Sequence, residues 1–563
     1  MHKLNRLYYT LQQLSYIQIV YRLYYIIKRK LIEQFGSFLY TKYEKNYGNT
    51  VFRIKNNSFF LLNNRSHYPY KIEDLLENKF TFLNHNINFG NTIDWHKAEL
   101  NTGTRLWKLN LNYHEFLIDI AYSFEKTKDN KYIKYIEKTI TDWFEQNPLG
   151  TIGYGQDNWN SYAISLRIIS WIKIYQCLGN DFSINFKELF IKLLWIQSRF
   201  LKDNLEYDIL GNHLIKNWKA LQWSKCFFKT NEFDKSITSL EKHVFIQFTE
   251  DKFHEELSPM YSAIVLEDLL EVYLIDNDSV KEDLIHGLFK NINFLSFSNN
   301  YSFFNDSVTN NGVQLNSLSD FYFKLFPQKK EIPFEGNFNI DGYIGFKNSN
   351  THLIIDLAKV VIGNQPGHLQ CDAMSFEFSK NGNKIFTNSG TYEYNYGARR
   401  YYSRSTQSHN TLKYSNFDQS EIWGSFRVAR QAQTDYEIIS QSNKNLKATG
   451  RVSGFDFNNN IVHQREFNCS DTKLRIKDIL ISSTKADDSK IFYHFTPEYS
   501  IKSNQIFNNK TNSIIASIFC NLEWEVVRTE YYKEFGQLSF KDTLIISSVP
   551  CNTEVKFEIQ FNE

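Results

Sequence analysis

Residues 367–426, GHLQCDAMSFEFSKNGNKIFTNSGTYEYNYGARRYYSRSTQSHNTLKYSNFDQSEIWGSF, are the stretch from which the rest of this chain is best interpreted. Within it, residues 374–379 alternate between apolar and polar side chains, which predicts a strand with one buried face. Asn381-Gly382 then predicts a two-residue hairpin turn, with residues 384–387 as the returning strand. Histidine, arginine and tyrosine side chains are denser here than a hydrophobic core requires, so the stretch is a candidate functional site.

The composition is that of a globular protein with at least two domains. The chain has 563 residues, of which 42% are hydrophobic and 22% charged, and a net charge of +2. That length exceeds a single ordinary domain. A net charge this small argues against nucleic-acid binding driven by overall electrostatics. The six cysteines are scattered without a CxxC pair and therefore indicate neither a disulfide framework nor a zinc ribbon.

Residues 1–45 predict one or two helices that are basic, aromatic and amphipathic. This segment has no uninterrupted apolar core and no small-residue cleavage site, so it does not resemble a secretory signal. No apolar run of about 18 residues elsewhere predicts a membrane span. A packed terminal helix is favoured over a membrane-surface anchor, and peripheral membrane contact stays open. We expect a cytoplasmic or membrane-associated protein, or a periplasmic one if it is exported by another route.

Helical periodicity dominates from about residue 105 to residue 325, and strand patterns dominate from about residue 340. Paired amphipathic helices are compatible with a bundle, a solenoid or a toroid. Strands that follow a helical half predict two segregated domains, the second an antiparallel β-sandwich. We therefore divide the chain into an N-terminal extension (1–95), a helical domain (96–330) and a β domain (338–563). The expected helices contain residues 113–124, 132–143, 164–175, 186–196, 217–228, 234–248 and 262–275, and the expected strands contain 353–361, 374–379, 474–481, 526–530 and 555–561.

The motifs in residues 367–426 resemble, in the same order, those of the heparinase II/III-type polysaccharide lyases, which include heparin-sulfate lyases and alginate lyase-like proteins. Two segments of the helical half resemble the family as well, Gly211-Asn212-His213-Leu214 and the run Glu256 to Tyr261, and the run Trp159 to Trp171 matches more weakly. In chain order, the matches in the organising stretch are Gly367, His368, Asp372, Ser389-Gly390-Thr391-Tyr392, Arg400, Tyr402, Arg404-Ser405-Thr406, His409-Asn410-Thr411, Gln419-Ser420, Trp423-Gly424 and Phe426.

The resemblance implies an α+β multidomain fold, in which an incomplete (α/α) toroid precedes an antiparallel β-sandwich. It also implies β-elimination on an acidic polysaccharide that contains uronic acid. That reaction removes the proton on the carbon beside a carboxylate, so the site has to neutralise the carboxylate before a base can act. Tyrosine or histidine can serve as the base and the acid when their pKa values are suitable.

The resemblance assigns these tasks to particular residues. Asn212 and His213 bind the carboxylate, and Tyr261 is the base and the acid. His368 is the catalytic histidine supplied by the second domain, and Tyr402 is a possible second tyrosine. The residues expected to bind substrate are Arg400, Arg404 and Trp159. Because these residues come from both domains, we expect the substrate in the cleft between them.

Three positions correspond to a zinc set in the family, and two of them depart from it. The chain offers Gln370 and Asn388, where the family has a histidine and an aspartate, and keeps His409. Two neutral amides replace an imidazole and a carboxylate, which Zn²⁺ prefers as ligands. We therefore expect that no cofactor is required and that zinc binds weakly or not at all.

Two other functions stay open. The departures at Gln370 and Asn388 are compatible with a non-catalytic protein that binds glycans or scaffolds the assembly of a surface polysaccharide. A toroidal glycoside hydrolase would need two facing carboxylates, about 5–10 Å apart. Glu256, Asp372 and Glu377 are the candidates for such a pair.

Overall fold

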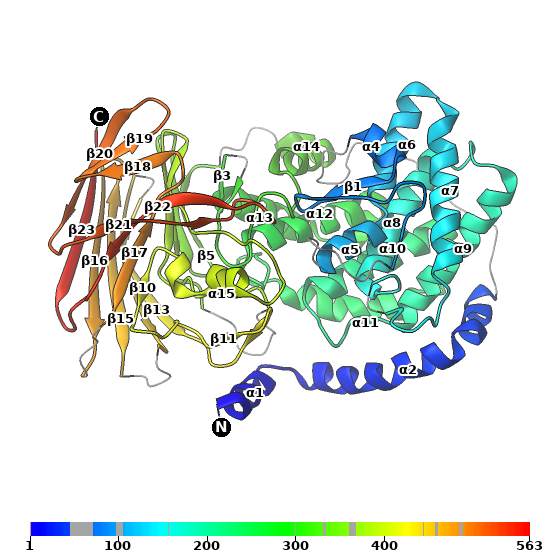
Figure 1. Cartoon of the computed structure of the whole chain (residues 1–563), viewed down its shortest axis with the longest axis horizontal. Coiled ribbons are helices and arrows are strands. Elements are labelled where there is room, and N and C mark those ends of the chain that lie inside the picture. The colour runs from blue at the N-terminus through cyan, green and yellow to red at the C-terminus, as the bar shows by residue number, and fades with distance from the viewer. Residues whose placement is uncertain are drawn as a thin grey trace.

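The computed structural model describes residues 2–45, 71–96, 105–155, 157–298, 300–329, 334–359, 367–442, 444–455, 460–483 and 488–562. Helices fill the N-terminal half of the described chain and β-sheets fill the C-terminal half (Figure 1). The last residues of the expected strand 353–361 and part of the expected domain boundary lie outside the described residues. No described helix combines the length and the apolar character that crossing a bilayer requires.

Three long helices form the inner part of the helical half. They are α8 (Ser161–Leu178), α10 (Asn212–Phe228) and α12 (Pro259–Ile275), and each buries residues around its whole circumference. Helix α10 packs against both α8 and α12. These helices are not apolar throughout, since α10 also buries polar residues, among them Lys216, Asn217 and Lys219.

Amphipathic helices surround this inner set. In α7 (Asn130–Gln146) the apolar residues recur at helical spacing, and Asp129 caps the helix by accepting a hydrogen bond from the Lys131 N–H at 3.0 Å. The other helices of this half are α4 (Ile72–Leu76), α5 (Arg105–Tyr113), α6 (Phe116–Thr127), α9 (Ile184–Asp203), α11 (Asp234–Val244), α13 (Glu282–Phe294) and α14 (Leu315–Leu325); it also holds the strands β1 (Lys79–Phe82), β2 (His85–Asn88), β3 (Ser296–Phe297) and β4 (Asn300–Tyr301).

The single helix expected over residues 113–124 is interrupted. Helix α5 ends at Tyr113 and α6 begins at Phe116, because His114 adopts a φ of +57°. The His114 ring is buried among tryptophans, and its Nδ1 accepts a hydrogen bond from Trp171 Nε1 at 3.1 Å. A tertiary contact therefore sets the break, and the apolar spacing alone does not reveal it.

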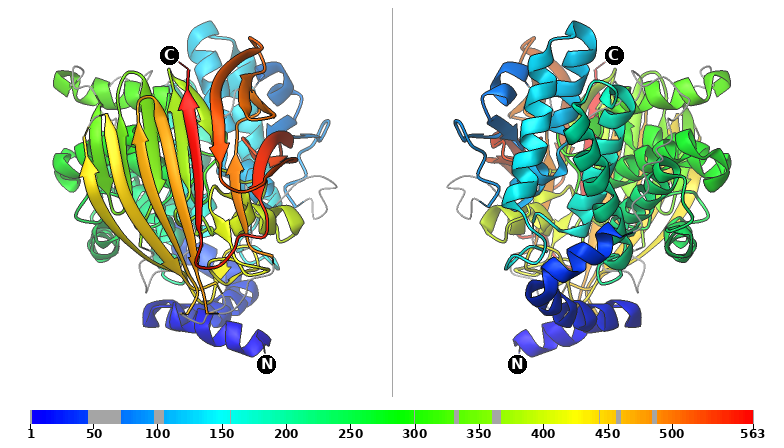
Figure 2. Two further views of the ribbon diagram at one scale, coloured as in Figure 1. Left: turned by 90° about the vertical axis from the view of Figure 1, so that its left-hand side faces the viewer. Right: turned by 90° about the vertical axis from the view of Figure 1, so that its right-hand side faces the viewer.

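The C-terminal half is built from antiparallel sheets. The predicted hairpin joins β8 (Phe376–Lys380) and β9 (Asn383–Phe386), with φ values of 49° at Asn381 and 73° at Gly382, as this kind of turn requires. Phe378 of the five-stranded sheet stacks on Phe561 of the eight-stranded sheet, with ring centroids 5.0 Å apart, so these two sheets share a core. Figure 2 shows the large sheet face-on.

The five-stranded sheet contains β5 (Gly336–Ile340), β6 (Tyr343–Lys347), β7 (Thr351–Asp356), β8 (Phe376–Lys380) and β9 (Asn383–Phe386). The eight-stranded sheet has the order β13 (Gln433–Gln441), β14 (Asn445–Ser453), β15 (Val462–Ser470), β16 (Lys473–Ile481), β23 (Glu554–Phe561), β20 (Ser513–Cys520), β19 (Gln505–Asn508) and β18 (Tyr499–Lys502). A four-stranded sheet has the order β10 (Leu412–Lys413), β17 (Lys490–His494), β22 (Ser539–Ile546) and β21 (Glu525–Tyr531); β11 (Ile422–Trp423) pairs with β12 (Arg427–Val428), and α15 spans Ala398–Arg404.

The N-terminal helices lie along one side of the molecule. Helix α2 (Tyr16–Glu44) runs beneath the helical half, and α1 (His2–Gln12) reaches the β half (Figures 1 and 2). The Arg6 guanidinium pairs with the Glu421 carboxylate at 2.9 Å, and Trp423 Nε1 donates to Thr10 Oγ1 at 3.0 Å. The two helices therefore bridge the halves.

Candidate active site

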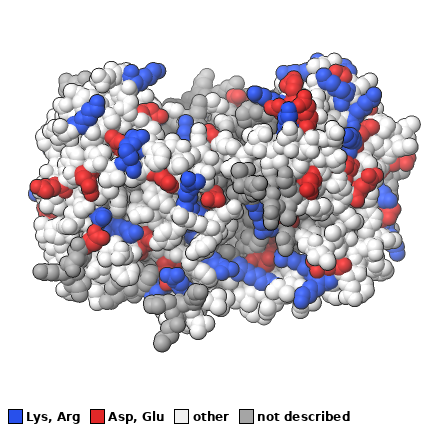
Figure 3. Space-filling model, viewed as in Figure 1, with Lys and Arg blue, Asp and Glu red and all other residues white. Residues whose placement is uncertain are grey.

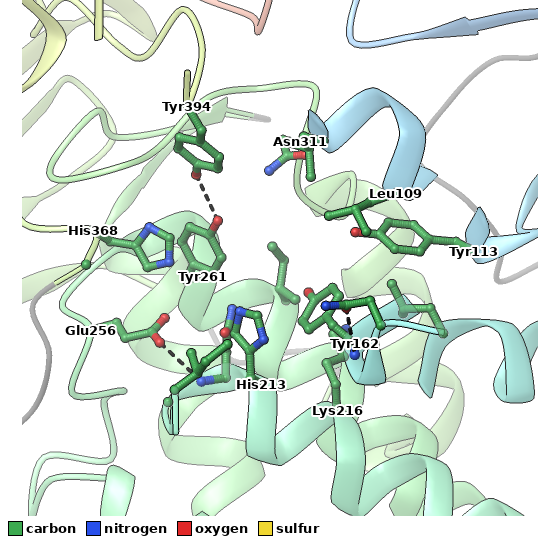
Figure 4. Close-up of a pocket in the computed structure, with 18 of the residues that line it drawn as sticks. Leu109, Tyr113, Tyr162, His213, Lys216, Glu256, Tyr261, Asn311, His368 and Tyr394 are labelled. Atoms are coloured by element: carbon green, nitrogen blue, oxygen red, sulfur yellow. Dashed lines mark hydrogen bonds between the residues drawn. The ribbon is translucent and has the colours of Figure 1, made fainter. Parts of the chain in front are cut away.

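A cavity of about 1050 Å³ lies where the two halves meet. Its lining includes Asn212, His213 and Tyr261 from the helical half, and His368 and Tyr394 from the β half. In Figure 4 the side chains of His213, Tyr261, His368 and Tyr394 surround one open space. Of the five residues that the sequence assigned to catalysis, the cavity lining contains Asn212, His213, Tyr261 and His368 and does not contain Tyr402.

The first turn of α10 carries Asn212 and His213 into the cavity. Gly211, just before the helix, has a φ of +57°, and a Cβ atom there would lie 2.4 Å from Glu256 Oε1. The Asn212 backbone N–H donates to the same Glu256 oxygen at 3.1 Å. Glycine therefore allows Glu256 to approach the helix start closely, and the N-terminal end of a helix favours negative charge nearby.

The surroundings of His213 favour its cationic form. Its Nδ1 donates to Glu206 Oε1 at 3.0 Å, and Glu206 is fixed in turn by Asn217 Nδ2, which donates to Oε2 at 3.0 Å. Burial by itself lowers the pKa of His213, but the carboxylates of Glu206, Glu256 and Asp208 raise it above the ordinary histidine value. The imidazolium is 31% exposed and faces the cavity, where it can pair with an anion.

Tyr261 lies at the start of α12. Ser258 caps this helix by accepting a hydrogen bond from the Tyr261 N–H at 3.2 Å, and it donates to the Asp306 carbonyl oxygen at 2.8 Å. The Tyr261 hydroxyl shares a hydrogen bond of 2.8 Å with the Tyr394 hydroxyl (Figure 4). Burial, followed by the neighbouring Tyr394, raises the pKa of Tyr261 well above the usual tyrosine value. Tyr261 is therefore a neutral phenol with a proton to donate.

His368 stacks on Tyr261 and is oriented by Asp306. The two rings are 3.8 Å apart between centroids, with an interplanar angle of 25°. His368 Nδ1 donates to Asp306 Oδ2 at 3.0 Å. Because the aspartate accepts the Nδ1 proton, it favours the tautomer in which Nε2 can receive a proton.

Two residues of the β half hold Asp306 in place: Gln370, before the Asn381-Gly382 hairpin, and Arg400, after it. Arg400 contacts both of its carboxylate oxygens, at 2.6 and 2.8 Å, and Gln370 Nε2 donates to Oδ1 at 2.8 Å. Burial tends to raise the pKa of Asp306, but Arg400 and His368 hold it well below the usual range. Asp306 therefore stays ionised and keeps its partner His368 in place.

Replacing Arg400 with Met is expected to lower the free energy of unfolding by about 3–5 kcal/mol, because it leaves the buried Asp306 charge without its bidentate partner. Denaturant unfolding measures the change. The matched control is Arg399→Met, since Arg399 is 40% exposed and lies 4.0 Å from Glu530, a surface pair with a contribution of about 1 kcal/mol or less. Equal losses in both variants would contradict this account of Asp306.

Four residues expected to act on the substrate lie outside the lining of the cavity, which corrects the sequence-based assignment. Arg400 is fully buried against Asp306, and buried Arg404 donates to three backbone carbonyls. Trp159 is buried, and its Nε1 donates to the Asn147 carbonyl oxygen at 2.9 Å. The Tyr402 hydroxyl instead contacts Ser389 Oγ at 3.3 Å.

The donors at the predicted metal positions do not fit zinc. Gln370 Nε2 donates to Asp306 and Thr391, and Asn388 Oδ1 accepts a hydrogen bond from Ser375 Oγ at 2.6 Å. Gln370 Oε1 and both ring nitrogens of His409 have no hydrogen-bond partner among the described residues, but a neutral amide oxygen is a poor zinc ligand beside the usual thiolate, imidazole and carboxylate. Burial of His409, together with the nearby Lys541 ammonium, lowers the pKa of its imidazole to about 3. No cluster of three His, Cys, Asp or Glu side chains suited to a metal occurs among the described residues.

Two important residues of the site were not found from the sequence. Tyr394 lies inside the organising stretch, where five tyrosines in a short run gave no means of choosing among them. Asp306 lies in a loop of the helical half with no motif around it. It meets His368 only because the loop docks on the β half, where the Asn305 N–H donates to Asp372 Oδ2 at 2.6 Å and the Asp306 N–H donates to the His368 carbonyl oxygen at 3.1 Å.

The floor of the cavity is charged but internally paired. Lys216 and Lys219 both contact Asp268 Oδ1, at 2.7 and 2.8 Å, and Lys173 contacts Glu271. These lysines lie deeper in the helical half than His213, as Figure 4 shows for Lys216. An anionic group that enters beside Tyr261 therefore meets His213 before it meets the paired floor.

Family models match both halves of the chain. The family model for the heparinase II/III N-terminus matches residues 39–334, and that for the heparinase II/III-like C-terminal domain matches residues 337–557. A heparin-sulfate lyase of Bacteroides stercoris is 23% identical over 431 residues, which cover 64% of this chain and 61% of that protein. The match thus spans less than two thirds of the length of this curated relative.

Solved structures share the fold. A crystal structure of heparinase III matches with a TM-score of 0.69 and 18% identity, over 93% of this chain and 88% of that one. Heparan sulfate lyase HepC from Pedobacter heparinus matches with a TM-score of 0.56 and 14% identity, over 94% and 87% of the two chains. These likenesses confirm the expected toroid followed by a β-sandwich. Because the N-terminal family model alone matches more than half of the chain, the protein belongs to the heparinase II/III family.

Proposed function

We propose that the protein is a polysaccharide lyase that cleaves a uronic-acid-containing polysaccharide by β-elimination. The observation that carries the proposal is the meeting of His213, Tyr261 and His368 in one cavity. An imidazolium, a neutral phenol and an oriented imidazole are the three groups that this reaction needs. Membership of the heparinase II/III family supports the same reaction class.

We assign neutralisation of the substrate carboxylate to residues in the first turn of α10. A proton beside a carboxylate is weakly acidic, because its removal builds a second negative charge next to the first. The His213 ring and the Asn212 side-chain amide lie together at the first turn of α10, where they can meet a substrate carboxylate, while the Asn212 backbone N–H is already taken by Glu256. We assign these groups to the substrate carboxylate, whose charge they stabilise as the proton leaves.

We assign proton transfer to His368 and Tyr261, whose rings stack on the opposite wall of the cavity. His368 Nε2 takes the proton from the carbon beside the carboxylate, and the electron pair of that C–H bond forms the double bond. The C4–O bond breaks as Tyr261 donates its proton to the leaving glycosidic oxygen. The raised pKa of Tyr261 keeps its hydroxyl protonated before the reaction, so we give it the role of the acid and not the combined base and acid role that the family resemblance implied.

A broad screen of polyuronates and glycosaminoglycans tests the proposal. A lyase product carries an unsaturated uronate with ultraviolet absorbance and forms without the uptake of water, which mass spectrometry detects. If the folded wild type forms no product from any of these polymers, the result would favour a non-catalytic glycan-binding protein. New reducing ends without the double bond would indicate a hydrolase.

The hydrolase alternative has weak support in the described site. Asp372 is buried and accepts the Asn305 N–H, and buried Glu377 accepts hydrogen bonds from Thr387 and from the Asn388 N–H. Of the three candidate carboxylates, Glu256 alone lines the cavity. The facing pair proposed from the sequence is therefore not assembled.

The role of His213 predicts the basic limb of the pH profile. Because its pKa is raised, the cation is present below that pKa and is lost as the pH rises through it. We expect kcat/KM to fall over that range, and Glu206→Gln to move the fall to lower pH, since the neutral amide no longer stabilises the cation. Steady-state rates across pH measure the shift. Glu523→Gln, at an exposed position, is the control, and an unmoved limb in Glu206→Gln would exclude His213.

We also propose that the activity needs no metal at the Gln370, Asn388 and His409 positions. Dialysis against a chelator is expected to leave both the melting temperature and the turnover unchanged, because neutral amides replace the imidazole and the carboxylate that zinc prefers, and Asn388 Oδ1 already accepts a hydrogen bond. Thermal unfolding and rate measurements on the dialysed protein test this. Loss of activity that zinc alone restores would contradict it.

A further inference from the structure

The N-terminal helices expose an apolar face that the fold does not use. We define this outer face by six residues: Leu4 of α1, and Tyr16, Leu23, Ile27, Leu31 and Phe38 of α2. All six are at least half exposed, with Tyr16 at 81% and Phe38 at 70%. A contiguous apolar surface of this kind marks an interaction site on a soluble domain.

The opposite face of α2 already supplies all the packing that holds the helix in place. Its buried residues recur about once every two turns. Gln18 Nε2 donates to the Ile209 carbonyl oxygen at 3.0 Å, and the Tyr25 hydroxyl donates to that of Leu205. Gly36 packs so closely on Gly150 that a Cβ atom would collide with the backbone. The outer face is therefore not needed to dock α2.

The charge of this segment identifies the kind of partner. Residues 2–45 contain eight lysines and arginines and two glutamates, a net charge of +6, whereas the whole chain carries +2. Four of these cations contact the body of the protein (Arg6, Arg22, Lys28 and Arg29), whereas Lys30 and Lys42 are exposed beside the outer face. Lys and Arg atoms gather along the lower edge of the molecule, where α2 lies, beside uncharged surface (Figure 3). A second copy of the chain would bring the same positive charge against it. An anionic lipid surface instead complements both the cations and the apolar side chains.

The segment is suited to lie on a bilayer and not to cross it. Helix α2 carries Arg22, the run Lys28–Lys30 and Glu33 within its length, and no described helix is apolar enough to span a membrane. Its outer face also presents Tyr16, a residue type enriched at the boundary between lipid and water, and Phe38, which is typical of the apolar face of an interfacial helix. Because α1 is attached to the β half and α2 to the helical half, both halves would sit on the same side of that boundary.

We propose that the outer face of α1 and α2 docks on the surface of an anionic lipid bilayer. The inner flank of the same helix reaches the cavity, since Arg22 and Arg29 belong to its lining. Arg22 also donates to the Asp208 carbonyl oxygen at 3.1 Å, in the loop that carries Glu206. Docking therefore places the cavity next to the membrane. The proposal does not depend on the reaction that the cavity performs.

Flotation with lipid vesicles tests the docking. The full-length protein is expected to float with vesicles that contain phosphatidylglycerol, less so at high salt, and to stay unbound with pure phosphatidylcholine. Leu23→Glu combined with Ile27→Glu is expected to weaken binding more than tenfold, since each substitution puts a carboxylate where an aliphatic side chain would be buried in the lipid. Lys30→Gln with Lys42→Gln should weaken it about fivefold per lost charge.

The matched control is Ile184→Glu, which places the same charge on an exposed isoleucine of α9. It should float like the wild type. All variants should keep the wild-type melting temperature and the wild-type rate on any soluble substrate, because the altered residues lie outside the catalytic groups. Wild-type flotation of the Leu23→Glu, Ile27→Glu variant would overturn the proposal. So would a wild-type dimer, seen by light scattering, that this variant dissociates without any vesicle binding by the wild type.

Discussion

Tyr261→Phe is expected to reduce kcat about 10²–10⁴-fold, the usual contribution of a positioned acid or base. The substitution removes one oxygen atom and keeps the ring that stacks on His368 at 3.8 Å. Tyr394 loses its partner but stays in the same aromatic cluster, with Phe426 and Phe535 about 5 Å away. Fold and substrate binding should therefore persist while the leaving oxygen lacks its proton donor. The measurement is the rate of unsaturated product at saturating substrate, together with a melting curve.

The matched control for this variant is Tyr402→Phe. Tyr402 was the other tyrosine proposed from the sequence, but its hydroxyl contacts Ser389 Oγ behind the cavity. The same chemical change there should leave kcat close to that of the wild type. A large loss in Tyr402→Phe with normal turnover in Tyr261→Phe would reverse the assignment of the acid. Normal turnover in both would remove tyrosine from the mechanism.

The sequence predicted the parts of the site that are encoded locally. The segment from Glu256 to Tyr261 combines an N-cap serine, a proline at the helix start and a tyrosine one turn on, so its geometry follows from neighbouring residues. The Asn381-Gly382 turn is local in the same sense. His368 was found because several motifs surround it in a fixed order.

The sequence-based predictions that were wrong concern residues whose roles depend on contacts with residues distant in the chain. A sequence does not distinguish an arginine that binds substrate from one that neutralises a buried aspartate, and Arg400 is of the second kind because Asp306, 94 residues earlier, lies against it. Arg404 likewise has its partners far away in the sequence, since it donates hydrogen bonds to the backbone carbonyls of Leu369, Gly424 and Arg427. The break at His114 likewise follows from its packing among tryptophans of other helices.

His368→Ala is the second variant with a large expected effect, a fall in kcat of about 10²–10⁴-fold. Asp306 keeps Arg400 and Gln370 when the imidazole is removed, so its charge stays compensated and the protein should fold normally. The loss should then appear in kcat and not in the melting temperature. His243→Ala, on α11 and outside the cavity lining, is the control and should turn over like the wild type.

Rescue of His368→Ala by added imidazole tests whether His368 is the catalytic base or only positions Tyr261. The deleted ring leaves space against a cavity of about 1050 Å³, which is large enough to admit free imidazole beside Asp306. If His368 Nε2 takes the proton, imidazole should restore part of the rate of His368→Ala, and the restored rate should grow with the neutral fraction of imidazole as the pH rises. His213 limits this growth at its own raised pKa, because the cation that neutralises the carboxylate disappears there. A rate that imidazole leaves unchanged at every pH would mean that His368 positions Tyr261 by stacking, and that the base is another group in the cavity.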